Sequence, residues 1–213
     1  MLISVTGFIG SGKDTIADYL VANYNFKRES FAGHLKDAIA MIFGWDRELL
    51  EGKTVEGREW RERVDPWWAE RLQIPHLTPR WVLQYWGTEV CRHGFHDDIW
   101  IASLQNKIRK TNENIVISDC RFPNELAMVK NLNGKTIQVS RGDKPAWYKY
   151  ALGVNLQQGD TQDLEYFQKR LDHYKIHASE TAWVGTEFDV EIFNDGTLEE
   201  LYSEIDYFLK VWN

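Results

Sequence analysis

The glycine-rich stretch near the N-terminus constrains the fold more than any other part of this sequence. Within GFIGSGKDT, the residues Gly7, Gly12 and Lys13 match the pattern G-x-x-x-x-G-K. The apolar run Leu2–Thr6 precedes this stretch, and apolar residues at helical spacing follow it. Glycines let backbone N–H groups turn toward phosphate oxygens, and a following helix adds positive potential. The sequence therefore predicts a strand, a phosphate-binding loop and a helix, in that order.

The residues around the last glycine indicate which class of phosphate-binding protein this is. Lys13 would supply a full charge to the β- and γ-phosphates of ATP, with Gly10 and Gly12 beside it in the loop. Asp14 stands where many P-loop ATPases and GTPases carry a Ser or Thr that binds magnesium. We expect Thr15, one place later, to bind phosphate, and Asp14 to support the loop or the water shell of the metal. This order favours a small-molecule kinase over a motor or switch protein.

Strands and helices alternate along the rest of the chain. Further strands are predicted at 26–31, 115–118, 136–139 and 188–193, and helices at 15–24, 34–43, 78–90, 98–110, 124–132 and from 197 onward. The alternation predicts an α/β P-loop kinase fold, with about five mainly parallel strands and helices on both faces. A chain of 213 residues fits a single domain, 1–213. Residues of about 45–77 would form a helical substrate-side insertion, and those of about 142–182 a lid.

The last helix carries two clear local signals. Thr197 and Glu200 form a capping box that starts it. Its predicted apolar face consists of Leu198, Leu201, Ile205, Phe208 and Trp212.

The end of the apolar run 115–118 is the second candidate site. Asp119 follows this run as a Walker B acid follows its strand, and its carboxylate would hold Mg²⁺, directly or through water. Arg121 would reach the phosphates or pair with Asp119. Glu125 is expected to be a surface or orienting residue. Phosphoryl transfer needs many positive groups. We expect the basic residues beside predicted element ends or in irregular segments to form, with the phosphate loop, a clamp for two phosphates: Lys36, Arg58, Arg80, Arg121 and Arg141.

Composition excludes several other classes of function. The formal net charge of −7 disfavours binding to a nucleic-acid backbone. Two cysteines, Cys91 and Cys120, are too few for a disulfide framework, and no apolar run is long enough to cross a membrane. The start of the chain lacks the layout of a signal peptide. The sequence thus predicts a cytoplasmic protein without nucleic-acid or membrane partners, and it leaves open whether the protein forms a homodimer.

Six segments of the sequence, in this order, are restrictive together: GFIGSGKDTIADYL, FAGHLKDAIA, QYWGTEV, ISDCRFPNE, IHASE and EIFNDGTLEELYSEI. They resemble the deoxynucleoside monophosphate kinases of tailed bacteriophages. The resemblance covers nearly the whole chain except much of 45–77 and 143–175. It departs from the family at Ile9 and Gly10, where the other members have basic residues, and in an inserted stretch that carries Lys144, Lys149, Lys169 and Arg170.

The resemblance implies an adenylate-kinase-like fold in which ATP, with Mg²⁺, phosphorylates deoxynucleoside monophosphates such as dGMP, dTMP or a modified dCMP for viral DNA synthesis. If the protein is viral, the host cell cytoplasm is its location. By matching position, the monophosphate side would include Leu35, Lys36, Arg58, Arg80 and Trp100, and in part Asp119 and Arg121. The ATP side would include Gly12, Lys13, Asp14, Thr15 and Arg141, with Glu180 near the lid. Catalysis is assigned to Lys13, Asp119 and Arg121.

Two alternatives remain open at this point. The first is a P-loop kinase for another small phosphate acceptor, such as dephospho-coenzyme A. The second is a regulatory module that binds ATP and transfers nothing, and such a module would not need Arg58, Arg80 and Arg121 to converge opposite Lys13.

Overall fold

The computed structural model of the protein describes residues 1–212. The backbone forms two compact units, of which the first combines Met1–Glu29 with the chain from Asn112 onward, and the second is Ser30–Thr111. Whether they act as one domain over 1–213 stays a prediction.

The first unit is built on one parallel sheet. Its strands are β1 (Leu2–Thr6), β2 (Phe26–Glu29), β3 (Asn114–Ile117), β4 (Lys135–Ser140) and β5 (Val190–Phe193). They lie in the order β2-β3-β1-β4-β5, and all neighbouring strands pair in parallel. The predicted α/β fold with a five-stranded sheet is confirmed, and the sheet is wholly rather than mainly parallel.

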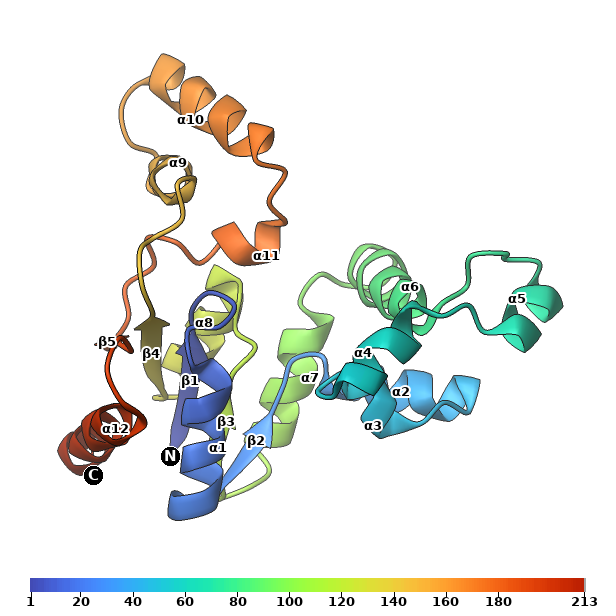
Figure 1. The fold of residues 1–213 in the computed structure, drawn as a ribbon, viewed down its shortest axis with the longest axis horizontal. Helices are drawn as coiled ribbons and strands as arrows, with labels where there is room; N and C mark the ends of the chain where they lie inside the picture. Colours follow the sequence, from blue (N-terminus) through green and yellow to red (C-terminus); the bar gives the residue numbers. More distant parts are fainter. Residues whose placement is uncertain (213) are drawn as a thin grey trace. The chain divides into compact units, whose positions relative to one another are not determined.

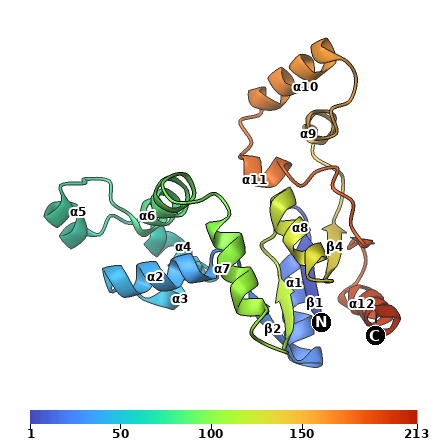
Figure 2. The ribbon, with the colours of Figure 1, turned by 180° about the vertical axis from the view of Figure 1, so that it is seen from behind.

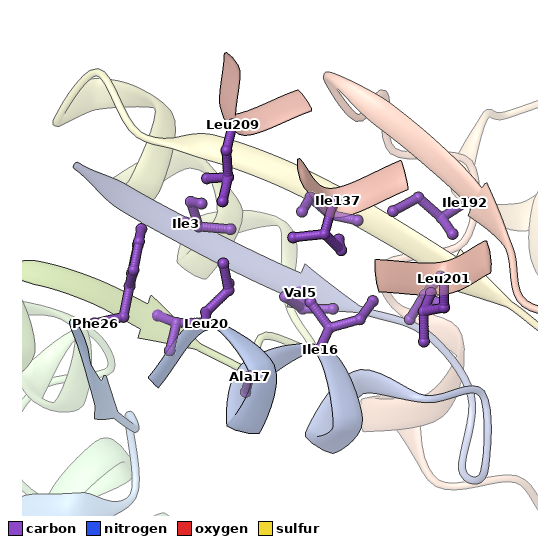
Figure 3. Packing of buried hydrophobic residues seen from close by; sticks show 13 residues of the cluster. Ile3, Val5, Ile16, Ala17, Leu20, Phe26, Ile137, Ile192, Leu201 and Leu209 are labelled. Atoms are coloured by element: carbon purple, nitrogen blue, oxygen red, sulfur yellow. The ribbon is translucent and has the colours of Figure 1, made fainter. Parts of the chain in front are cut away.

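Two helices cover one face of this sheet. They are α1 (Lys13–Tyr24) and α12 (Leu198–Trp212), and between them and the strands lies the main apolar core (Figure 3). The strands contribute alternate residues to this core, as expected for a period of two. Ile3 and Val5 of β1 are fully buried against Ile16 and Leu20 of α1.

The other helices of the first unit lie on the opposite face of the sheet and beyond one of its ends. α8 (Pro123–Asn131) covers the face away from α1, as the two views in Figures 1 and 2 show. α9 (Tyr148–Asn155), α10 (Thr161–His173) and α11 (Ala178–Thr181) lie beyond the end of β4, where α9 packs against α10. The predicted lid region is therefore helical, and its role as a lid stays a prediction.

The second unit is entirely helical. Its helices are α2 (Gly33–Phe43), α3 (Arg47–Glu51), α4 (Val55–Glu62), α5 (Pro66–Leu72), α6 (Pro79–Tyr85), η1 (Trp86–His93) and α7 (Ile99–Ile108). An aromatic-rich core joins them, in which the Phe43 and Trp45 rings stack 4.4 Å apart. Thr78 caps α6 with Pro79 in its first turn, as predicted. The predicted continuation to Val90 is a π-helix, η1, which runs on to His93.

Local signals at the last helix are partly confirmed. Thr197 and Glu200 form the predicted capping box. Leu201 and Ile205 are buried, but Leu198 is 53% exposed, and Leu209 takes its place in the core. The prediction for Leu198 was wrong, because this first residue of α12 lies outside the buried core cluster. No helix within residues 1–212 has the length and apolar character needed to span a membrane.

Candidate active site

The phosphate loop lies between β1 and α1, and two close approaches explain its glycines. A Cβ atom on Gly7 would overlap the carbonyl oxygen of Val139 in β4. Gly12 has φ of 108°, and a Cβ atom there would overlap the amide nitrogen of Asn194. That Asn194 amide donates to the carbonyl of Ser11 at 2.9 Å. The turn after β5 thus holds the loop from outside, and only glycine fits at position 12.

Lys13 folds back over its own loop. Its Nζ atom donates to the carbonyls of Gly7 at 2.8 Å and Phe8 at 2.6 Å. Burial lowers the pKa of Lys13 below 10.5, and the nearby charge of Arg121 adds to this, while the carboxylates of Asp14 and Glu180 oppose it. The amine therefore feels charges from two other parts of the unit, the turn that carries Arg121 and the helix α11 that carries Glu180.

A cavity of about 440 Å³ opens beside the loop, a size typical of small-molecule sites. Its lining comes from the loop and α1, from the residue after β4 and from the turn into α12: Gly10, Gly12, Lys13, Asp14, Thr15, Arg141, Asn194, Gly196 and Leu198. All predicted ATP-side residues are thus brought together in one cavity. Sequence reasoning did not assign Asn194, Gly196 and Leu198 to the site, because Leu198 was expected in the apolar face of the last helix and the other two carry no charge that would point to a phosphate.

The turn after β3 carries the predicted acid and arginine. Asp119 lies two residues after the end of β3, and Arg121 donates from Nη1 to Glu180 of α11 and to Ser179 Oγ at 3.3 Å. Glu125 is only 3% exposed and accepts from the backbone N–H of Arg121 at 2.7 Å. Of its two expected roles, surface or orienting, Glu125 therefore has the orienting one, and it acts from inside the protein.

The same turn contains a cysteine without a reactive thiol. Cys120 is buried, and burial raises the pKa of its thiol well above 9.0. The neutral thiol acts as a small apolar side chain. The chemistry of the turn therefore rests with its charged residues.

The basic residues predicted for the monophosphate side lie in the second unit, and each has a contact there. Lys36 donates to Glu51 at 2.6 Å. Arg58 donates to the Lys53 carbonyl at 3.0 Å, and Arg80 pairs with Glu62.

The two apolar residues predicted for the monophosphate side belong to the core of the second unit. Leu35 is 7% exposed within it. Trp100 packs against the same core and donates from Nε1 to the Gly87 carbonyl at 2.9 Å. Packing in this core thus accounts for the positions of the Leu35 and Trp100 side chains.

A third arginine, Arg61, lies near enough to Arg58 and Arg80 for their charges to act on it. The guanidinium of Arg61 lies over Gly52, and its Nε atom is buried without a hydrogen-bond partner among the described residues. Burial lowers the pKa of Arg61, and the charges of Arg80 and Arg58 add to this. Sequence reasoning missed Arg61, although it lies one helical turn after Arg58.

The basic side chains of the inserted stretch contact tyrosines. Lys144 lies 4.7 Å from the Tyr148 ring centroid, and Lys149 lies 5.0 Å from that of Tyr150. Arg170 lies 5.4 Å from the same Tyr150 ring. These distances are within the range of cation–π interactions. The Arg170 contact joins α10 to α9, whereas the two lysine contacts are local to the start of α9.

The sequence is similar to viral kinases over most of its length. A protein of Acanthamoeba polyphaga mimivirus, assigned as a deoxynucleotide monophosphate kinase, is 30% identical over 220 residues, which cover 96% of this chain and 94% of the relative. The deoxynucleoside-5'-monophosphate kinase of Escherichia phage T5 is 27% identical over 62% of this chain and 73% of its own. The deoxynucleotide monophosphate kinase of Enterobacteria phage T4 is 23% identical over 99% of both.

Comparisons of other kinds are less informative. No model of a known protein family matches the sequence. Among solved structures, a shikimate kinase from Aquifex aeolicus superimposes with a TM-score of 0.47 at 16% identity, over 99% of this chain and 96% of its own. A dephospho-CoA kinase from Campylobacter jejuni has a TM-score of 0.43 at 17% identity, over 98% and 95%.

Proposed function

Because the chain belongs to the deoxynucleotide monophosphate kinase family, we propose that its phosphate loop holds ATP while a deoxynucleoside 5'-monophosphate accepts the phosphoryl group. Family membership makes the protein an enzyme that phosphorylates deoxynucleoside monophosphates. The observation that carries the ATP assignment is the cavity beside Lys13, which the loop, Thr15 and Arg141 line together. The rival acceptor dephospho-coenzyme A has no support from the relatives at the sequence level.

The reaction forms one bond and breaks one. An oxygen of the acceptor phosphate attacks the γ-phosphorus, the bond to the oxygen that bridges to ADP breaks, and ADP and a deoxynucleoside diphosphate result. Lys13 releases the carbonyls of Gly7 and Phe8 and follows the transferred group. Arg121 and Arg141 offer positive charge to the phosphates. Such charge acts where negative charge spreads in the transition state.

Magnesium fits the residues on the ATP side. Mg²⁺ bound to a nucleotide needs only one or two protein carboxylates and keeps several waters. Within residues 1–212 no group of three or more His, Cys, Asp or Glu side chains could hold a metal ion by itself. Asp119 would hold the ion directly or through water, and the ion would neutralise charge on the β- and γ-phosphates, while Thr15 would bind phosphate.

The acceptor would be bound by the arginines of the second unit. Arg58 and Arg80, together with Lys36, would bind its phosphate, and the planar guanidinium suits this task. Leu35 and Trp100 would contribute apolar contacts to the nucleoside, and Glu180 would lie near it when the lid region is closed. dGMP, dTMP and a modified dCMP are the candidate substrates.

A panel of acceptors tests the proposal. ADP release from Mg²⁺·ATP is measured with each ribo- and deoxyribonucleoside monophosphate and with dephospho-coenzyme A, and Lys13→Ala serves as the inactive control. We expect turnover with at least one deoxynucleoside monophosphate and none with dephospho-coenzyme A. Turnover with dephospho-coenzyme A alone, or ATP binding without turnover on any acceptor, would contradict the proposal.

A further inference from the structure

Arg28 contacts two chain segments beside the proposed phosphate site, the start of α1 and the turn after β3. It lies on β2, next to α1 and β3, and its side chain is 25% exposed. Its Nη2 atom donates to Asp14 Oδ1 and, at 2.6 Å, to Ser118 Oγ. Its Nη1 atom donates to Asp18 Oδ1 at 3.0 Å. Asp14 directly follows Lys13, and Ser118 directly precedes Asp119, so one guanidinium joins the two catalytic segments.

Asp14 places a negative charge where phosphates would bind. Its side chain is 74% exposed and lines the cavity beside the loop. Its charge also acts on the Lys13 amine, because it works against the lowering of the Lys13 pKa. A carboxylate in this place repels a polyphosphate unless a cation neutralises it.

We propose that Arg28 is a positioning residue that holds Asp14 beside Ser118 and neutralises its charge, so that the phosphates of ATP can occupy the cavity. The inference rests on the proposed ATP site. Ser118 is 8% exposed, and its hydroxyl lies 3.4 Å from Asp14 Oδ1. This second, buried anchor keeps the guanidinium at the carboxylate that faces the cavity. Asp18, one helical turn further along α1, binds the other nitrogen and lies outside the cavity lining.

The affinity for ATP in the presence of Mg²⁺, measured by calorimetry, tests this role. We expect Arg28→Gln to raise the Kd by about five- to tenfold, as expected for exposing one like charge near the phosphates. In an Asp14→Asn background, Arg28→Gln should change the Kd by less than about threefold, because the repulsive charge is already gone. Asp18→Asn is the matched control: it removes one ion pair of Arg28 and should leave the Kd unchanged.

The double variant separates neutralisation from a merely structural role. If Arg28 only supports the fold, Arg28→Gln weakens ATP binding equally with Asp14 and with Asn at position 14, and that result would overturn the inference. A Kd for Arg28→Gln equal to that of the wild type would also overturn it. Should Arg28→Gln fail to fold, the same cycle is run with Arg28→Lys, where we expect a rise of about two- to threefold that Asp14→Asn again removes. The proposed ATP site fails separately, if Lys13→Ala binds ATP as tightly as the wild type.

Discussion

Arg121 and Glu180, 59 positions apart in the sequence, form an ion pair in the first unit. The pair joins the turn after β3 to α11, and both charges act on the Lys13 amine. In this arrangement the arginine that would serve the phosphates is paired with a carboxylate of the predicted lid region. A bound phosphate would compete with Glu180 for the guanidinium.

Loss of the Arg121 charge should therefore slow the reaction far more than it destabilises the fold. For Arg121→Ala we expect kcat to fall on the order of 10²–10³, the usual effect of removing one transition-state contact. The melting temperature should change little, because the Arg121 side chain is 40% exposed and exposed ion pairs contribute little to stability. Lys130→Ala, which removes a surface contact of α8 to the Glu187 carbonyl, is the control and should keep full activity. A large loss of stability with normal activity of the folded fraction would make Arg121 structural.

The lowered pKa of Lys13 predicts a pH dependence for ATP. The Lys13 amine binds its proton more tightly in the unfolded chain than in the folded one, so the charged amine costs folding stability at lower pH. This cost disappears as pH rises from the lowered pKa toward 10.5. Over the same interval the amine loses its charge, and kcat/KM for ATP should fall with a midpoint below pH 10.5. Arg121→Gln removes one cause of the shift and should move the midpoint upward. A profile that stays flat up to pH 10.5 would contradict the assignment of Lys13.

The acid at the end of β3 should matter for turnover more than for folding. We expect Asp119→Asn to lower kcat and to raise the Mg²⁺ concentration needed for half-maximal activity, because an amide is a weaker ligand for a hard cation than a carboxylate. The comparison is activity against melting temperature at saturating and limiting Mg²⁺. If the variant unfolds and its folded fraction works normally, Asp119 is structural.

The arginines of the second unit should affect one substrate only. We expect Arg58→Lys and Arg80→Lys each to raise the KM for the deoxynucleotide by about tenfold or more, about 1.4 kcal/mol, because lysine cannot make the two parallel hydrogen bonds of a guanidinium. The KM for ATP should change much less. Arg63→Lys is the matched control. Arg63 is an exposed arginine at the end of α4, the helix of Arg58, and it pairs with Glu59, so its replacement should change neither KM. An equal rise of the KM for both substrates would show that Arg58 and Arg80 do not act on the deoxynucleotide alone.

Sequence alone determined the features that depend on neighbouring residues. The strand, glycine loop and helix from Leu2 to Tyr24 follow from apolar periodicity and the backbone freedom of glycine. The start of α6 at Pro79 and the capping box at Thr197 follow from hydrogen bonds within one turn. Such signals act over three or four positions, so they can be read without knowing the rest of the fold.

Only the tertiary structure decided which distant side chains meet at the loop. Asn194 holds Ser11, Leu198 turns from the core to the cavity, and Arg28 pairs with Asp14. Periodicity shows which face of an element is buried, but it does not identify the partner on that face. These contacts depend on the strand order β2-β3-β1-β4-β5, which places β2 beside β3 and β5 beside β4 and so brings the ends of distant segments to one loop.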